Sequence, residues 1–91
     1  MEPYRLQIAS DIQRDGLGVE LLDGGGNCVA EVFRCDRDHT LTLSTFCYEV
    51  PLQAIQQLVS TATEGLGPFE DGTPLADAEL CEPRRADHRE C

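Results

Sequence analysis

Apolar and polar side chains alternate through the first half of the chain in short runs, and this alternation predicts β-strands. Leu6 and Ile8, for example, alternate with polar neighbours, as expected for a strand with one buried face. Turn-forming residues separate the runs, and the DGGGN stretch at 23–27 is the clearest of these turns. The predicted strands cover residues 4–10, 19–22, 28–35 and 41–48. Because their connections are short, neighbouring strands should pair antiparallel as a meander.

The apolar period becomes helical after Pro51. Proline suits a first helical turn, where its missing N–H has no partner to lose. The glycines at 65 and 67, followed by Pro68, end the helix. The apolar positions between these signals are Leu52, Ile55, Leu58, Val59 and Ala62. A helix this short is stable only when its apolar stripe packs on the sheet.

The predicted fold is therefore α+β, with four strands and one C-terminal helix packed on one face of the sheet. This ββββα domain is expected to cover residues 1–68. Residues 69–91 show no period and are rich in acidic residues, so they are predicted to be a flexible acidic tail. At most one helical turn is expected within that tail, over residues 75–81.

The side chains that face the helix depend on the turn at 36–39, because a one-residue change of register exchanges the two faces of a strand. The favoured register buries one side of every strand. The residues then expected to point inward are Leu6, Ile8, Val19, Leu21, Val29, Phe33, Leu41 and Leu43.

The charge of the chain is strongly one-sided, with 17 acidic residues against 7 basic ones and a net charge of −10. All the basic residues are arginine. Such a chain is repelled by nucleic-acid phosphates and by anionic membranes, and it is attracted to basic protein surfaces. The charge therefore predicts a protein partner with a basic surface, no direct nucleic-acid binding and no membrane binding. The alternative is that the acids serve solubility alone.

The sequence also predicts a cytoplasmic location. It has neither an apolar run long enough to span a bilayer nor the pattern of a signal peptide. Its cysteines number 5 and lack CxxC spacing, unlike those of a secreted disulfide scaffold.

The stretch FRCDRDHT, residues 33–40, raises the question of a metal site, because it offers Cys35, Asp36, Asp38 and His39. Consecutive strand residues point to opposite faces, so Cys35 and Asp36 should not converge. Aspartates are common in tight turns, and a turn explains the same residues. The set at 81, 88 and 91 (Cys, His, Cys) provides too few ligands for zinc. No metal and no cofactor are predicted.

Catalytic machinery is also not expected. The predicted domain contains one histidine, His39, at the tip of a turn, and its Ser44 and Cys47 lie within a strand. The glycines at 24–26 lie between strands and do not open a helix, unlike a phosphate-binding loop. We predict no catalytic residue and no enzyme activity; an enzyme that uses Cys47 or His39 is the opposing alternative.

Two features favour a binding surface. The stretch 50–63 has no charge, and its outward face includes Gln53, Gln56 and Gln57. Depletion of charge is a property of interface cores, and the alternative is an ordinary solvated glutamine-rich face. Phe46 and Tyr48 should lie on the sheet face away from the helix, where exposed aromatics anchor partners. A bend of the strand would bury them instead.

The run 29–69, with its segments AEVFR, VPLQAI and LGPF, resembles small uncharacterised bacterial proteins built from a β-meander and one C-terminal helix. Small acidic domains of this kind include immunity proteins that neutralise toxins and phage-type inhibitors. The resemblance implies a class of binding protein and provides no functional residue.

Together these features predict a small acidic protein-binding module that masks a basic site on a partner protein. It would act as a toxin-immunity protein or a nucleic-acid-mimicking inhibitor does. The carboxylates expected to face the partner belong to Glu20, Glu31, Asp36, Asp38 and Glu49. The alternative is a structural or homodimeric subunit without an inhibitory role, joined through the open sheet face or the neutral helix face.

Overall fold

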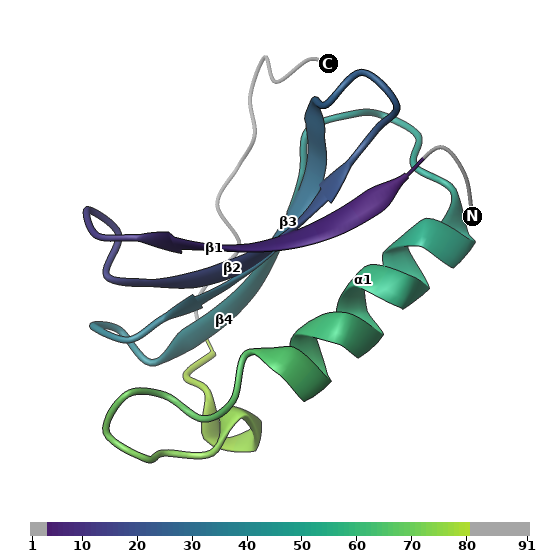
Figure 1. Ribbon diagram of the computed structural model, residues 1–91. Helices are drawn as coiled ribbons and strands as arrows, with labels where there is room; N and C mark the ends of the chain where they lie inside the picture. Colours follow the sequence, from purple (N-terminus) through teal and green to yellow (C-terminus); the bar gives the residue numbers. More distant parts are fainter. Residues whose placement is uncertain (1–3, 81–91) are drawn as a thin grey trace.

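The computed structural model describes residues 4–80, and it confirms the predicted ββββα fold (Figure 1). The four strands form one antiparallel sheet in the order β1-β2-β3-β4. The elements are β1 (Arg5–Asp11), β2 (Gly16–Leu22), β3 (Cys28–Cys35), β4 (Thr40–Thr45), α1 (Leu52–Gly65) and a short 3-10 helix η1 (Leu75–Asp77).

Helix α1 lies along one face of the sheet, over the two central strands β2 and β3 (Figure 1). Its buried positions are Ala54, Leu58 and Ala62, one turn apart along a single stripe. The two alanines allow the helix to approach the sheet closely, and Leu58 fills the space between them. Within the described residues, no helix is long and apolar enough to cross a membrane.

The register confirms most of the predicted inward face but corrects Phe33. Directly paired residues share a face, and Val19 pairs with Val32, which pairs with Leu43. Phe33 pairs instead with Gly18 and Thr42, on the face away from α1. The cause is an irregularity beside Leu21 and Leu22, where β3 holds one extra residue.

The extra residue is Val29, because Leu21 pairs with Ala30 and Leu22 pairs with Cys28. Val29 and Ala30 therefore both belong to the helix-facing core. Strict alternation from Val29 to Phe33 places the ring of Phe33 on the wrong side. A bulge leaves no signal in the apolar pattern, so the alternation alone does not detect it.

The sheet face away from α1 is called the second face. There the ring of Phe33 is buried by two glycines and an arginine. It lies over Gly16 and Gly18 of β2, where any side chain would occupy the same space. The guanidinium carbon of Arg14 lies 3.9 Å from the ring centroid, in a cation–π contact. Strand β2 begins at Gly16, three positions before the predicted start at residue 19, so both glycines lie inside the strand, where Phe33 needs the space.

We expect Gly18→Ala to lower the free energy of unfolding by about 1–3 kcal/mol, because the added carbon overpacks this face. A Cβ at Gly18 would lie 2.6 Å from Oε2 of Glu31 and 3.1 Å from Cδ1 of Phe33. Urea denaturation measures the change. Gly25→Ala is the matched control in an exposed turn and should change stability by less than about 0.5 kcal/mol. Equal effects of the two substitutions would contradict this packing.

The turn at 23–27 is confirmed, and Asp23 organises it. Its Oδ1 accepts hydrogen bonds from the backbone N–H groups of Gly25 and Asn27, both at 2.9 Å. The backbone hydrogen bond from Asn27 is the main cause that holds the pKa of Asp23 below its ordinary value of 3.8.

This depressed pKa has a consequence for stability. The unfolded chain binds the proton first, so the contribution of Asp23 is present above about pH 4 and is lost as the pH falls through the folded pKa. We expect an NMR titration of the carboxyl carbon of Asp23 to give a midpoint below 3.8. A midpoint at or above the value of an unstructured aspartate would contradict the turn geometry.

Strand β4 ends at Thr45, three residues before its predicted end, and the chain then leaves the sheet. The predicted placement of Phe46 and Tyr48 on one strand face is therefore wrong. Phe46 is half-buried, and its N–H donates to the carbonyl of Val29 at 2.9 Å. Tyr48 is 84% exposed, in the loop that leads to α1.

The described packing continues past the domain boundary predicted after residue 68. Phe69 is 1% exposed and ranks among the most buried side chains. The segment then turns back toward β4, where the N–H of Glu79 donates to the carbonyl of His39 at 2.7 Å. Residues 69–80 therefore belong to the folded body. The remainder of the predicted tail, residues 81–91 with the Cys, His, Cys set, lies outside the described residues.

Candidate acidic binding surface

Three segments that are far apart in the sequence meet at one end of the sheet: the β1–β2 turn (12–15), the β3–β4 turn (36–39) and residues 69–80 (Figure 1). The N–H of Asp36 donates to the carbonyl of Asp15 at 2.8 Å and joins the two turns. The rings of His39 and Phe69 lie 4.9 Å apart, and Nε2 of His39 lies 2.9 Å from Oδ2 of Asp71. We call residues 11–15, 36–39 and 69–80 the acidic end.

Arg34 of β3 anchors this end to the helix. Its Nη1 donates to the carbonyl of Leu66 and, at 2.7 Å, to the carbonyl of Pro68, just after α1 ends. Its Nη2 donates to Oδ2 of Asp36 at 3.1 Å, and its Nε lies 3.1 Å from Oδ1 as an ion pair without hydrogen-bond geometry. Arg34 is only 6% exposed, so a charged residue acts here as a core crosslink.

The guanidinium of Arg14, in the β1–β2 turn, is likewise fully hydrogen-bonded to carboxylates on the second face. Its Nη1 and Nη2 donate to the two carboxylate oxygens of Glu31 at 3.0 and 2.9 Å. Its Nε donates to Oδ2 of Asp11 at 2.6 Å, and these two carboxylates raise the pKa of Arg14 above its usual value. The hydrogen bond from Arg14 is also the main cause that lowers the pKa of Asp11.

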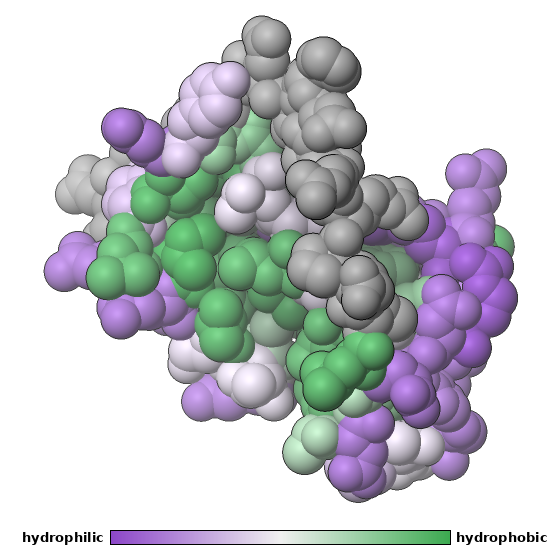
Figure 2. Space-filling view, turned by 180° about the vertical axis from the view of Figure 1, so that it is seen from behind, coloured by the Kyte–Doolittle hydropathy of each residue, from purple (hydrophilic) through white to green (hydrophobic). Residues whose placement is uncertain are grey.

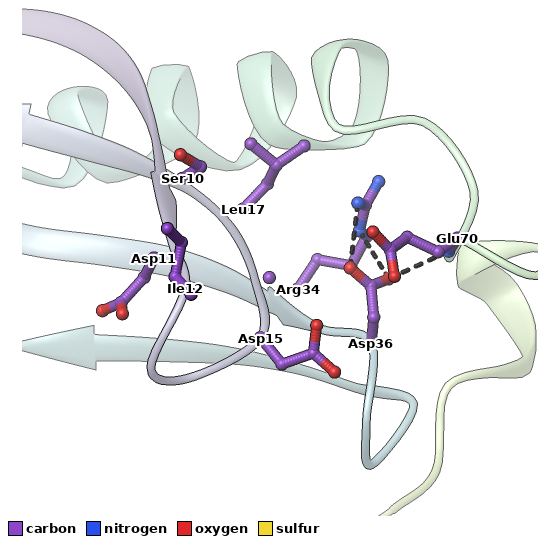
Figure 3. Close-up of a pocket in the computed structure, with 9 residues that line it drawn as sticks. Ser10, Asp11, Ile12, Asp15, Leu17, Arg34, Asp36 and Glu70 are labelled. Carbon is purple, nitrogen blue, oxygen red and sulfur yellow. Dashed lines mark hydrogen bonds and ion pairs between the residues drawn. The ribbon is translucent and has the colours of Figure 1, made fainter.

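Between the turns lies a shallow pocket of about 250 Å³ (Figure 3). Its walls are mixed, because apolar side chains from β2 and the β1–β2 turn face carboxylates from the three segments. The lining residues are Ser10, Asp11, Ile12, Asp15, Gly16, Leu17, Arg34, Asp36 and Glu70. Carboxylate oxygens of Asp15, Asp36 and Glu70 lie within 4.8 Å of one another.

The chemistry of the pocket favours an organic cation over a metal ion. Both oxygens of Asp36 are already engaged, one by Nη2 of Arg34 and the other by the N–H of Glu70 at 3.0 Å. The guanidinium of Arg34 also places a positive charge beside the three acids. Two carboxylates remain for a ligand, those of Asp15 and Glu70, and neither accepts a hydrogen bond from another described residue.

The acids predicted to face a partner do not form one surface. Glu31 and Asp36 are held inside the fold by Arg14 and Arg34, so their selection as surface charges is wrong. Glu20 lies in mid-sheet, where Oε1 accepts a hydrogen bond from Nε2 of Gln7 at 2.7 Å. Asp38 is exposed at the acidic end, and Glu49 is exposed in the loop before α1.

The predicted glutamines are all exposed on α1: Gln53, Gln56 and Gln57. They belong to the helix layer and are separate from the acidic end, as is Tyr48. The predicted set is thus spread over the sheet, the acidic end, the loop before α1 and α1 itself, and it does not identify the pocket between the turns.

Asp15 and Glu70 are the pocket residues that sequence reasoning overlooked. Asp15 had a weak signal, because Asp-Gly at 15–16 is typical of a turn with positive φ, and Asp15 adopts a φ of 59°. Glu70 had none, since it lies in the segment assigned to a flexible tail. The burial of Phe69 and the hydrogen bond from the N–H of Glu70 to Asp36 bring it beside Asp15.

The chain matches no family model, no curated protein and no solved structure. The resemblance of residues 29–69 to immunity-type and inhibitor-type proteins therefore stays a prediction.

Proposed function

We propose that this chain is a non-catalytic protein-binding module, without a cofactor, that captures a basic segment of a partner protein at its acidic end. Masking of that segment, as an inhibitor or immunity protein would do, is the proposed consequence. The observation that carries the proposal is the pocket where the carboxylates of Asp15 and Glu70 meet without partners among the described residues.

The pocket suits a lysine or arginine side chain. The aliphatic stem of such a residue packs against apolar walls while its charged head stays among acids. Leu17 and Ile12 supply the apolar walls, and Ile12 is 92% exposed at the rim. Asp15 and Glu70 supply the acceptors, with arginine favoured where two oxygens are presented together.

The surrounding charge supports the same ligand. The acidic end holds eight acidic side chains and two arginines, and Arg34 of β3 also lines its pocket. Arg14 and Arg34 are both engaged by carboxylates within the fold, so acidic side chains remain in excess. A surface of one sign attracts an oppositely charged segment and raises its association rate. The same field repels nucleic acid directly.

The experiment is calorimetric titration with an arginine-rich peptide at low and high salt. We expect affinity to fall as ionic strength rises from about 0.05 to about 0.5 M, because the Debye length shortens several-fold. The double variant Asp15→Asn, Glu70→Gln should weaken binding at low salt by about tenfold or more, equivalent to about 1.4 kcal/mol.

The matched control is Glu64→Gln, which removes one exposed charge from α1, outside the acidic end. It should leave affinity within about twofold, as expected of a screened distant charge. If the control and the double variant lost equal affinity, binding would depend on net charge alone and not on this pocket. Affinity that does not change with salt would contradict electrostatic capture.

A further inference from the structure

Strand β4 is an edge of the sheet that carries no charge. Among the described residues the sheet order ends at β4, so one side of its backbone has no strand partner. Its sequence is TLTLST, whereas the opposite edge, β1, carries Arg5 and Asp11. Natural edge strands are usually protected from pairing by charge, proline or a covering element. The β4 edge has neither charge nor proline, and among the described residues the backbone hydrogen bond from Glu79 reaches His39, the residue just before the strand.

Apolar side chains are exposed on β4 and on α1, which packs on the sheet face that Leu43 shares. Leu43 of β4 is 49% exposed, and Val59 and Leu52 of α1 are 43% and 70% exposed. Val59 lies seven positions after Leu52, so the two residues are two turns apart on the same flank of the helix. Figure 2, seen from the side opposite to Figure 1, shows apolar surface gathered along the helix side of the molecule.

Charge indicates what can cover this surface. Two copies of a chain with a net charge of −10 repel each other over most of their surfaces. Neither β4 nor the helix through Thr63 contains a charged residue. A second copy therefore meets its least repulsion along the β4 edge and the adjoining helix flank.

The residues of β4 are also complementary to themselves. In an antiparallel pair around a twofold axis at Thr42, Leu41 of each copy faces Leu43 of the other on the helix side. Thr42 then faces Thr42, and Thr40 faces Ser44, on the second side. Leucine pairs and threonine or serine pairs are both favourable across antiparallel strands.

We propose that two copies of this chain pair through β4 to form a continuous eight-stranded antiparallel sheet with both α1 helices on the same face. The interface is isologous, as in most homodimers. The proposal does not depend on the acidic end. Because the paired strands run antiparallel, the two β3–β4 turns lie at opposite ends of the seam, and the dimer presents two separated acidic ends.

Sedimentation of the full chain tests the proposal at about 1–100 µM, a range that covers ordinary dimer affinities. We expect twice the 10.0 kDa mass of one chain. Dimerisation should strengthen as salt rises, because screening weakens the repulsion between the copies. This sign is opposite to that expected for peptide binding, so the two proposals succeed or fail separately.

Leu43→Glu should weaken association at least about tenfold, because it places like charges beside the seam. Ile8→Glu is the matched control, since Ile8 faces the same side from the other edge and is 53% exposed. It should leave the dimer intact. Val59→Glu, on the helix flank, should also weaken association. Unchanged thermal unfolding of the variants shows that they are folded.

Three outcomes would overturn the proposal. A monomer throughout the concentration range means that the β4 edge does not pair with a second copy. A dimer that survives Leu43→Glu means that another surface is used. A dimer lost equally in Ile8→Glu means that association responds to charge anywhere on the helix-facing side.

Discussion

Arg34→Ala is expected to lower the free energy of unfolding by about 3–5 kcal/mol, the range for removing one partner of a buried ion pair. The substitution leaves Asp36, whose side chain is 5% exposed, as a buried carboxylate without its counter-charge. It also leaves the carbonyls of Leu66 and Pro68 without their donor. For a chain of this size, whose total stability is about 5–14 kcal/mol, this is a large part of the whole.

Chemical denaturation monitored by circular dichroism measures this loss. Arg37→Ala is the control. The side chains of Arg37 and its ion-pair partner Asp38 are 64% and 59% exposed, so this substitution should lower the free energy of unfolding by less than about 0.5 kcal/mol. The pair Arg34→Met, Asp36→Asn removes both charges and should recover part of the stability lost in Arg34→Ala. A loss below about 1 kcal/mol in Arg34→Ala would show that the crosslink contributes little.

Phe69→Ala is expected to cost about 3–5 kcal/mol, as is typical for truncating a buried aromatic residue. Phe69 is 1% exposed and lies against His39, so its removal leaves a cavity beneath the β3–β4 turn. The segment 69–80 should detach from the sheet at the same time. Hydrogen exchange should then lose protection at the N–H of Glu79, which donates to His39.

Leu80→Ala is the control for Phe69→Ala. Leu80 is 98% exposed, so its truncation should change stability by less than about 0.5 kcal/mol. If the two substitutions had similar effects, residues 69–80 would contribute nothing to the folded body, and the domain would end where the sequence placed it.

The sequence predicted the fold class because the signals for it are local. Alternation gives the strands, the helical spacing after Pro51 gives α1, and short connections leave the antiparallel meander as the simple topology. The turn at 36–39 was likewise predictable, since aspartate tolerates turn geometry, and the structure places a turn there that ends at His39 with a φ of 56°.

The errors share a different cause, which is pairing between distant parts of the chain. The bulge at Val29 changes the face of Phe33 without any trace in the alternation. Glu31 and Asp36 look like free surface acids until Arg14 and Arg34 are placed beside them. Arg14 is 17 positions from Glu31 in the sequence. Arg34 is only two positions from Asp36, but the distant carbonyls of Leu66 and Pro68 hold this pair inside the fold. Composition therefore counts these charges as available when the fold has already neutralised them.

The pocket depends on three separate segments and shows why a site can be harder to predict than a fold. Asp15 and Glu70 are 55 positions apart. They meet because Arg34 holds the end of α1 and Phe69 packs beside His39. The acidic character of the proposed ligand site was predictable from net charge, whereas its location was not.

The most direct test of the central claim is an NMR titration with an arginine-rich peptide at low salt. We expect the backbone amide signals of the acidic end to shift, with the largest changes at Asp15 and Glu70, while the turn at 23–27 stays unchanged. Shifts confined to α1, or no shifts at all, would contradict the proposal that this protein captures basic segments at its acidic end.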